Sequence, residues 1–212
     1  MRLVVFGATG GTGLQLVRQA LDLGHEVTAV VRDPAKLPAE LRDRAEVVTA
    51  DVMDPDAVAP AVKDRDAVLV ALGARDRGPT TVHSGSTRSI VSAMERVGAR
   101  RLLLVSAAGM VADAGDGPFT RYVLKPLVVQ PLFKNSYTDL AVAERLLRAA
   151  DLDWTIVRPS RLTDAGRTGR YRTARDLNVR GGRSTTRADL AECMLSLIED
   201  PTSAGHVVSV AS

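Results

Sequence analysis

The sequence predicts an α/β fold in which a single domain, residues 1–212, forms a doubly wound parallel sheet. Three observations support this fold class. Short runs rich in Val, Leu and Ile recur along the chain, and their continuous apolar character is typical of strands buried on both faces. Segments with helical spacing of apolar residues alternate with these runs, which favours right-handed β-α-β crossovers. A glycine-rich turn joins the first apolar run to the first helical segment.

Seven apolar runs are the expected strands. In chain order they are Leu3–Phe6, Val27–Val31, Glu46–Thr49, Ala67–Val70, Leu102–Val105, Trp154–Val157 and His206–Val210. Four helical segments are expected, each with one apolar face. These faces consist of Leu14, Val17 and Leu21; Ile90, Met94 and Val97; Leu140, Ala143, Leu147 and Ala150; and Leu190, Cys193, Met194 and Leu197. Gly24 and Gly98 are expected to end the first two helices. Thr186 and Asp189 have the spacing of a capping box before the last one.

The glycine-rich turn reads Gly7-Ala8-Thr9-Gly10-Gly11-Thr12-Gly13 and lies between the first strand and the first helix. In dinucleotide-binding Rossmann folds such glycines permit a tight turn, approach of the backbone to a pyrophosphate, and close packing of helix on strand. Free N–H groups and the helix dipole then favour an anion. The spacing is wider than in the G-x-G-x-x-G pattern, and the alternative is an ordinary turn. The residues expected to contact the dinucleotide are Gly7, Thr9, Gly10, Gly11, Thr12 and Gly13.

The end of the second strand favours NADP(H) over NAD(H). Arg32 is the first residue after that strand, and Lys36 follows about one helical turn later. A guanidinium at this place can hold a ribose 2′-phosphate through paired N–H donors. Asp33 could instead reach a ribose hydroxyl, but Pro34 after it favours a role as a cap.

Further cofactor contacts are expected where the third and fourth strands end. Asp51 and Val52 close the third strand, where a carboxylate could meet the adenine amino group. Asp51 could equally cap a helix that begins near Pro55. Leu72, Gly73 and Ala74 close the fourth strand, where small residues leave room for a cofactor.

Two long segments interrupt the alternation of strands and helices. Residues 107–135 contain glycines and three prolines, and residues 161–184 are rich in Arg, Gly and Thr. Both follow the carboxyl ends of expected strands, where ligands bind in open α/β sheets. We therefore expect these loops to shape the substrate pocket, although a structural excursion is the alternative.

Composition favours a small anionic ligand and a reducing compartment. The net charge is +3, without a basic run interleaved with aromatics, so no nucleic-acid partner is expected. A single cysteine, Cys193, cannot form an internal disulfide, which fits the cytoplasm. The start of a strand at the N-terminus leaves no visible signal peptide. The apolar stretch 122–133 is too short to span a bilayer, so no membrane contact is expected, and no metal site is expected.

These segments together resemble the atypical short-chain dehydrogenase/reductase superfamily, on the basis of Gly7 to Gly13, Val31-Arg32-Asp33 and Asp51-Val52. More specific segments resemble the biliverdin reductase B family, also called flavin reductases (NADPH). They are Leu72-Gly73-Ala74-Arg75-Asp76, Pro79-Thr80-Thr81-Val82 and Val105-Ser106-Ala107. The resemblance extends to Tyr171, so it covers most of the chain, and NmrA-like proteins share part of the pattern.

The resemblance implies an NADPH-bound Rossmann domain with an open site for flat substrates above the nicotinamide. The implied cofactor contacts are Gly10, Thr12, Arg32, Lys36, Asp51, Val52, Leu72, Gly73, His83 and Ser106. Pro159, in the Arg-Pro-Ser segment after the sixth strand, joins them. His83 stands where the family has Met. Ser106 also follows the fifth strand, so its position alone predicts that it lies near the nicotinamide.

The chain departs from its relatives at two places. Arg161 replaces a histidine, and a guanidinium can hold a carboxylate or phosphate but cannot act as an acid near neutral pH. The Tyr-x-x-x-Lys pair of the wider superfamily is also missing. Tyr137 is followed four residues later by Ala141, so it lacks the lysine that lowers a tyrosine pKa. Tyr122 and Lys125 are one residue too close to form such a pair.

These features lead to a first hypothesis, NADPH-dependent hydride transfer to a flat, anionic, conjugated acceptor such as a flavin or quinone. Ser106, Arg161 and Tyr137 are the catalytic candidates: Ser106 would orient the nicotinamide or acceptor, Arg161 would bind an anionic tail, and Tyr137 would pack or face the substrate. The alternative is an NADP(H)-sensing protein of NmrA type without turnover. An epimerase or dehydratase is disfavoured, because little chain follows Arg161. The chain could be a monomer or a homodimer.

Overall fold

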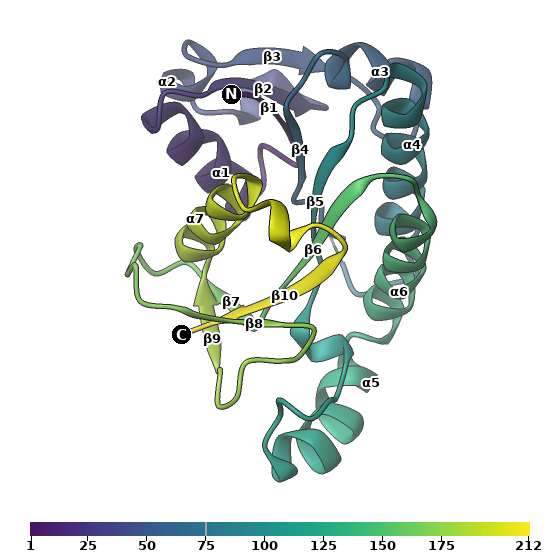
Figure 1. The fold of residues 1–212 in the computed structure, drawn as a ribbon, viewed down its shortest axis with the longest axis vertical. Helices are drawn as coiled ribbons and strands as arrows, with labels where there is room; N and C mark the ends of the chain where they lie inside the picture. The colour runs from purple at the N-terminus through teal and green to yellow at the C-terminus, as the bar shows by residue number, and fades with distance from the viewer. Residues whose placement is uncertain (75) are drawn as a thin grey trace.

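The central sheet has eight strands in the order β3-β2-β1-β4-β5-β6-β10-β8 (Figure 1). The computed structural model describes residues 1–74 and 76–212, so Arg75 in the segment 72–76 lies outside the described residues. All neighbouring strands in the sheet are parallel except β10 and β8. The eight strands are β1 (Arg2–Phe6), β2 (Glu26–Val31), β3 (Glu46–Thr49), β4 (Ala67–Val70), β5 (Arg101–Val105), β6 (Asp153–Pro159), β8 (Arg172–Arg175) and β10 (His206–Ala211).

Helices cover both faces of this sheet, as Figure 1 shows. The α-helices are α1 (Gly11–Asp22), α2 (Ala39–Arg42), α3 (Pro55–Val62), α4 (Val82–Val97), α5 (Gln130–Leu132), α6 (Lys134–Ala149) and α7 (Arg187–Ile198). Helices α1 and α7 pack on one face, and α3, α4 and α6 pack on the other. Strand β1 illustrates the reason: Leu3 and Val5 enter one core, while Val4 and Phe6 enter the other. The doubly wound fold predicted from the sequence is confirmed.

The strand order places a switch point beside β1. The chain adds β2 and β3 on one side of β1, then crosses to add β4, β5 and β6 on the other. Crossovers that start at the same strand in opposite directions leave a crevice at the carboxyl ends of the strands. The glycine-rich turn follows β1, so the fold places it at this crevice.

Residues 107–135 are more regular than the sequence suggested. After a short 3₁₀ turn, η2 (Ala108–Met110), the chain forms η3 (Thr120–Val129), a helical segment with wide π-type turns that continues into α5. Pro126 and Pro131 lie inside this helical stretch, which is why we expected an irregular loop there. Since proline lacks an N–H, it removes a helical hydrogen bond. The expectation of irregular structure was wrong over residues 120–132.

Residues 161–184 also contain regular structure. Strands β7 (Arg161–Thr163) and β9 (Ser184–Thr186) form a separate parallel pair, and β8 extends the main sheet. Asp189 in α7 fixes this excursion, because its fully buried carboxylate accepts hydrogen bonds from the N–H of Thr168 and Gly169 and from the Thr168 hydroxyl. The predicted Thr186 cap is confirmed, since its hydroxyl accepts the Asp189 N–H at 2.9 Å.

Candidate functional site

The glycine-rich turn has the packing that the sequence predicted. Gly7 has φ +80°, and a Cβ there would lie 2.5 Å from the carbonyl oxygen of Ala71 just after β4. A Cβ on Gly13 would overlap the backbone of Gly7. These contacts leave no space for side chains between β1, β4 and α1. The packing roles of Gly7 and Gly13 are therefore confirmed.

The first turn of α1 provides the groups that an anion needs. The helix begins after Gly10, no side chain caps it, and its first turn contains no acidic residue. The first N–H of the helix that donates to a carbonyl of its own helix is that of Leu14, which donates to Gly10. The N–H groups of Gly11, Thr12 and Gly13 precede it and have no helical acceptor. A diphosphate fits this arrangement through its charge and its acceptor oxygens.

Arg187 lies over the same turn, which the sequence did not suggest. A Cβ on Gly11 would lie 2.6 Å from its Cδ and 2.8 Å from its Nε. The guanidinium donates to Asp164 at 2.6 Å. Arg187 begins α7, which packs beside α1 although the two helices are far apart in the sequence. No local pattern could have placed this cation at the N-terminus of α1.

The predicted 2′-phosphate region is open to solvent. Arg32 directly follows β2, and both Arg32 and Lys36 are exposed. Asp33 accepts the Ala35 N–H at 3.1 Å and so caps the 3₁₀ turn η1 (Pro34–Lys36), as we expected. Lys36 Nζ lies 3.9 Å from the Asp33 carboxylate. Two cations thus lie beside the end of β2, and the neighbouring carboxylate is engaged in a turn.

The ends of β3 and β4 contain the next predicted contacts. Asp51 accepts the Met53 N–H at 2.9 Å, whereas Asp54 caps α3 by accepting the Asp56 N–H. Asp51 therefore stabilises a turn and is not the cap of α3, and it remains exposed, as the neighbouring Val52 is in part. Nothing lies within 4 Å of a Cβ added at Gly73, between Leu72 and Ala74. That open space at the carboxyl end of β4 fits a bound cofactor.

Ser106, after β5, belongs to a buried polar network. Its hydroxyl donates to the Glu144 carboxylate of α6 at 2.7 Å. Arg158 of β6 binds the same carboxylate through Nε at 2.9 Å and Nη2 at 2.5 Å. Ser106 and Glu144 are 6% and 4% exposed. The sequence predicted Ser106 but did not identify Glu144 and Arg158 as its network. Both residues are distant from Ser106 in the chain, and no local motif links them to it.

Tyr137 lies against the loop that follows Ser106. Its hydroxyl and ring contact Gly109 so closely that a Cβ on Gly109 would overlap the Tyr137 oxygen. Burial raises the pKa of Tyr137 above its ordinary value. The other tyrosine and lysine do not form a pair: Tyr122 is exposed, while the Lys125 ammonium is buried and bound to Ala108, Val111 and Asp116. Burial therefore opposes ionisation of Tyr137, and Tyr122 has no lysine partner in Lys125.

His83 begins α4 inside the protein. Its backbone N–H and that of Ser84 donate to Asp139 of α6, which satisfies the start of α4. The imidazole Nε2 lies 3.3 Å from the Ser136 hydroxyl. Burial lowers the pKa of His83, although the Asp139 charge opposes this shift. Its contact with a cofactor stays a prediction, since the side chain is 6% exposed.

The remaining candidates lie at the end of β6. Pro159 is buried and is the last residue of β6, and Arg161 in β7 is exposed. Among the described residues, no carboxylate lies within ion-pair distance of Arg161. The fold therefore places Gly7, Arg32, Gly73, Ser106 and Pro159 at or just after the carboxyl ends of parallel strands of the sheet.

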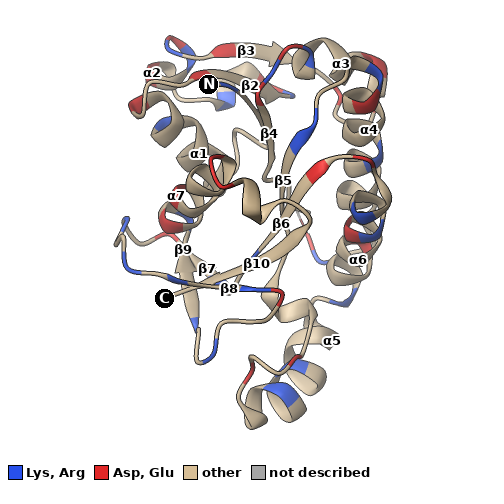
Figure 2. Cartoon of the chain, in the orientation of Figure 1, with Lys and Arg blue, Asp and Glu red and all other residues tan. Residues whose placement is uncertain are grey.

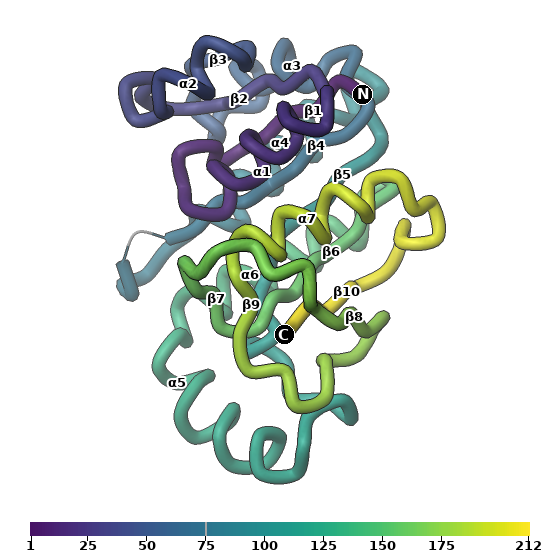
Figure 3. Tube along the Cα trace, turned by 90° about the vertical axis from the view of Figure 1, so that its left-hand side faces the viewer, coloured from purple at the N-terminus to yellow at the C-terminus, as the bar shows by residue number. Residues whose placement is uncertain are grey.

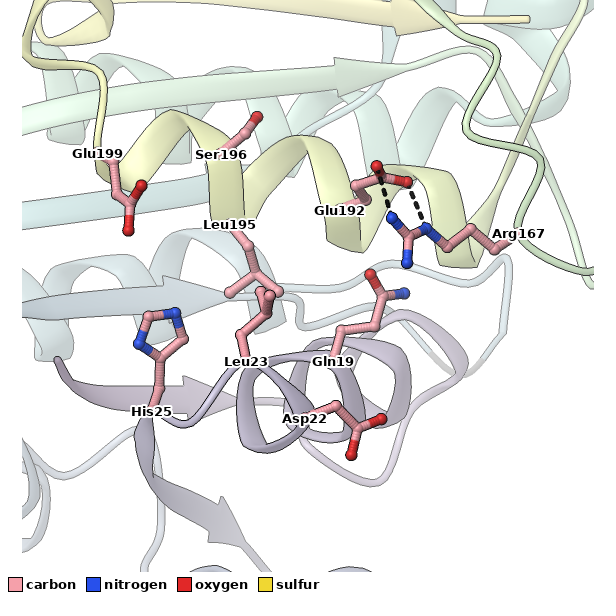
Figure 4. Close-up of a pocket in the computed structure, with 9 residues that line it drawn as sticks. All are labelled: Gln19, Asp22, Leu23, His25, Arg167, Glu192, Leu195, Ser196 and Glu199. Carbon is pink, nitrogen blue, oxygen red and sulfur yellow. Dashed lines mark hydrogen bonds and ion pairs between the residues drawn. The ribbon is translucent and has the colours of Figure 1, made fainter.

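A groove of about 500 Å³ lies elsewhere, between α1 and α7 (Figure 4). It is lined by Gln19 and Leu23 near the end of α1 and by Glu192 and Leu195 of α7, with Arg167 donating to Glu192 at 2.6 and 2.8 Å. None of the predicted site residues lines it. In the described part of the chain, no three His, Cys, Asp or Glu side chains are grouped to hold a metal.

Comparison with known proteins identifies the family. The family model described as NAD(P)H-binding matches residues 7–201. The uncharacterized protein YwnB of Bacillus subtilis is 28% identical over 206 residues, which cover 95% of this chain and 93% of YwnB. The 3-diazoavenalumate denitrifying reductase of a Streptomyces species is 34% identical over 181 residues, or 78% of this chain and 58% of that protein.

A similar fold has been solved for ChuY, an anaerobillin reductase from Escherichia coli O157:H7. The TM-score is 0.79 with 24% identity, and the match covers 100% of this chain and 97% of ChuY. This likeness concerns the fold. The family match spans most of the chain and includes the glycine-rich turn. The chain thus belongs to this NAD(P)H-binding family.

Proposed function

We propose that the chain is an NADPH-dependent reductase of a flat, conjugated acceptor such as a flavin or quinone. The observation that carries this proposal is that, among the described residues, Tyr137 beside the loop after Ser106 is not an activated acid. Burial raises the pKa of Tyr137, and Ala141 stands where a lysine would lower it. An acceptor whose reduced form takes its proton from water needs no such acid. Carbonyl reduction by a Tyr-Lys pair is therefore disfavoured.

Bound NADPH would supply the hydride, and the protein would supply position and electrostatics. The N–H groups at the start of α1 and Arg187 would hold the diphosphate, and Arg32 with Lys36 would hold the 2′-phosphate. Gly73 would leave room for the nicotinamide nucleotide of the cofactor. Pro159, the last residue of β6, would contact the same part of the cofactor. Loops 107–135 and 161–184 would form the walls of the acceptor pocket.

Ser106 would act as a hydrogen-bond acceptor. Its single hydroxyl proton is used on Glu144, so its lone pairs remain for a donor in the site. The carboxamide N–H₂ of a nicotinamide and the ring N–H of a flavin are such donors. Arg158 donates to both carboxylate oxygens of Glu144 and would thereby fix the Ser106 hydroxyl. Glu144 and Arg158 are positioning residues in this account.

A redox-sensing protein without turnover remains the second candidate. The lack of an activated tyrosine at Tyr137 favours it as well, because cofactor binding would need only the glycine-rich turn and the cations Arg32 and Lys36. It would bind NADPH as tightly as an enzyme does, but it would not oxidise the cofactor in the presence of any acceptor.

We expect NADPH oxidation with FMN and with menadione, because neither needs a protein acid. Arg161→Ala should raise the KM for FMN, which has a phosphate, by about tenfold while leaving the KM for menadione within about twofold. Steady-state kinetics with both acceptors measure this difference. Absence of turnover with every acceptor, together with retained NADPH binding, would reject the enzyme and favour the sensing protein.

Arg32→Ala should weaken NADPH binding by about tenfold to a hundredfold, since a hydrogen bond to a charged group contributes about 1.5–3 kcal/mol. NADH binding should change by less than about threefold. Calorimetric titration of both cofactors tests this. Arg100→Ala is the matched control, because Arg100 is exposed and precedes β5 at the opposite edge of the sheet. Equal NADPH affinity in Arg32→Ala and wild type would contradict the proposed contact.

Glu144→Gln should lower kcat by about tenfold in the wild-type background and by less than about twofold in the Ser106→Ala background. The reason is that Glu144 acts through the Ser106 hydroxyl, so its effect disappears with that group. Kinetics of the two single variants and the double variant complete the cycle, and thermal unfolding reports the separate loss of stability. Independent, multiplying effects on kcat would show that Glu144 has only a structural role.

A further inference from the structure

An exposed apolar surface lies on η3 and α5, within the segment 107–135 that we place around the acceptor pocket. Leu127 is 69% exposed, Phe119 67% and Tyr122 65%. The members of this surface, which we call the apolar surface, are Phe119, Tyr122, Val123, Leu124, Leu127, Val128, Leu132 and Phe133. Soluble monomers rarely expose so many neighbouring large apolar side chains, and such patches mark interaction sites.

The apolar side chains are held outward because the polar residues of the same helix are bound inward. The Lys125 ammonium donates to the carbonyls of Ala108 and Val111 and to Asp116, and its side chain is 8% exposed. Gln130 donates to the Met110 carbonyl at 3.2 Å. The helix is thus attached to the protein through its polar side, which leaves its apolar side facing solvent.

The charges within the segment that carries the apolar surface are of one sign. Residues 117–138 contain three cations, Arg121, Lys125 and Lys134, and no acidic residue. Since Lys125 is paired with Asp116, the charges left on this segment are positive. The Arg121 guanidinium lies 5.2 Å from the Tyr122 ring, and that of Arg77 lies 5.5 Å from the Phe133 ring. Cations therefore border the aromatic members of the surface.

More cations lie at the same end of the molecule. Asn178 joins the two regions, because its amide donates to Val111 and Asp116 at the base of η3. Figures 1 and 3 both place η3 beside the loop between β8 and β9, and Figure 2 shows basic residues on both. Two exposed arginines of this loop have no ion-pair partner within the described part of the chain: Arg180 and Arg183.

We propose that the apolar surface docks on a membrane that contains anionic lipids. Apolar and aromatic side chains of such a helix enter the acyl boundary, while flanking Lys and Arg bind the headgroups. A second copy fits less well, because two-fold pairing would bring unpaired cations of both copies together. This proposal replaces the expectation from the sequence that no membrane takes part. No helix of the described residues has the length and apolar content to span a bilayer, so the contact is peripheral.

The test is sedimentation of the full chain with vesicles of phosphatidylcholine, with or without phosphatidylglycerol. We expect binding to the anionic vesicles, weakened by salt, and at least about tenfold weaker binding for Leu127→Asp. Leu23→Asp is the matched control, since Leu23 is 65% exposed beside the groove of Figure 4, and it should bind like wild type. Circular dichroism confirms that both variants fold.

Three results would overturn the proposal. The first is binding to anionic vesicles that Leu127→Asp does not weaken. The second is no binding of the wild type to anionic vesicles. The third is a stable dimer of the wild type in sedimentation velocity that Leu127→Asp converts to a monomer, which would assign the surface to contact between copies. Vesicle binding is measured without NADPH or acceptor, so this test is independent of the proposed activity.

Discussion

The contact between Gly7, Gly13 and the end of β4 fixes where this protein can hold an anion. Gly7 has a positive φ and lies against Ala71, and Gly13 lies against Gly7. No side chain therefore fits at these two positions between β1, β4 and helix α1. That contact aims the first turn of α1 at the crevice between β1 and β4. Arg32 and Gly73 follow β2 and β4, which pair with β1, and Ser106 follows β5, which pairs with β4. The pairing of these strands therefore sets where the three residues lie relative to the start of α1.

Buried charged side chains then connect the helices to the loops around that crevice. Asp139 satisfies the start of α4, Glu144 joins β5 to β6, Asp189 fixes the loop at Thr168, and Lys125 attaches η3. Each is hydrogen-bonded by several partners, which a buried charge requires. Glu144 and Lys125 are also paired with opposite charges, so removing Arg158 or Asp116 would leave a buried charge unpaired. Ser106 is therefore held in a buried hydrogen-bond network, whereas Arg161 is exposed.

The sheet and the turn could be predicted because their signals are local. Continuous Val and Leu runs located seven strands, and the runs 46–49 and 67–70 match β3 and β4 at both ends. The Asp33 cap followed from Pro34 after it. The three short strands β7, β8 and β9 were missed because they are polar and two of them have three residues. Helix η3 was missed because its prolines disfavour helix, whereas burial of Lys125 stabilises it through tertiary contacts. Glu144 and Arg187 act across 38 and more residues, so no local pattern identifies them.

The central claim is that this site promotes hydride transfer without a protein acid. The most direct test is the pH dependence of kcat for menadione reduction at saturating NADPH, measured for wild type and Tyr137→Phe. Burial raises the pKa of Tyr137 and lowers that of His83, so neither group changes its charge between about pH 7 and 9. The account predicts that kcat stays within about twofold over that range in both proteins. A fall of about tenfold per pH unit in wild type that is absent in Tyr137→Phe would contradict it.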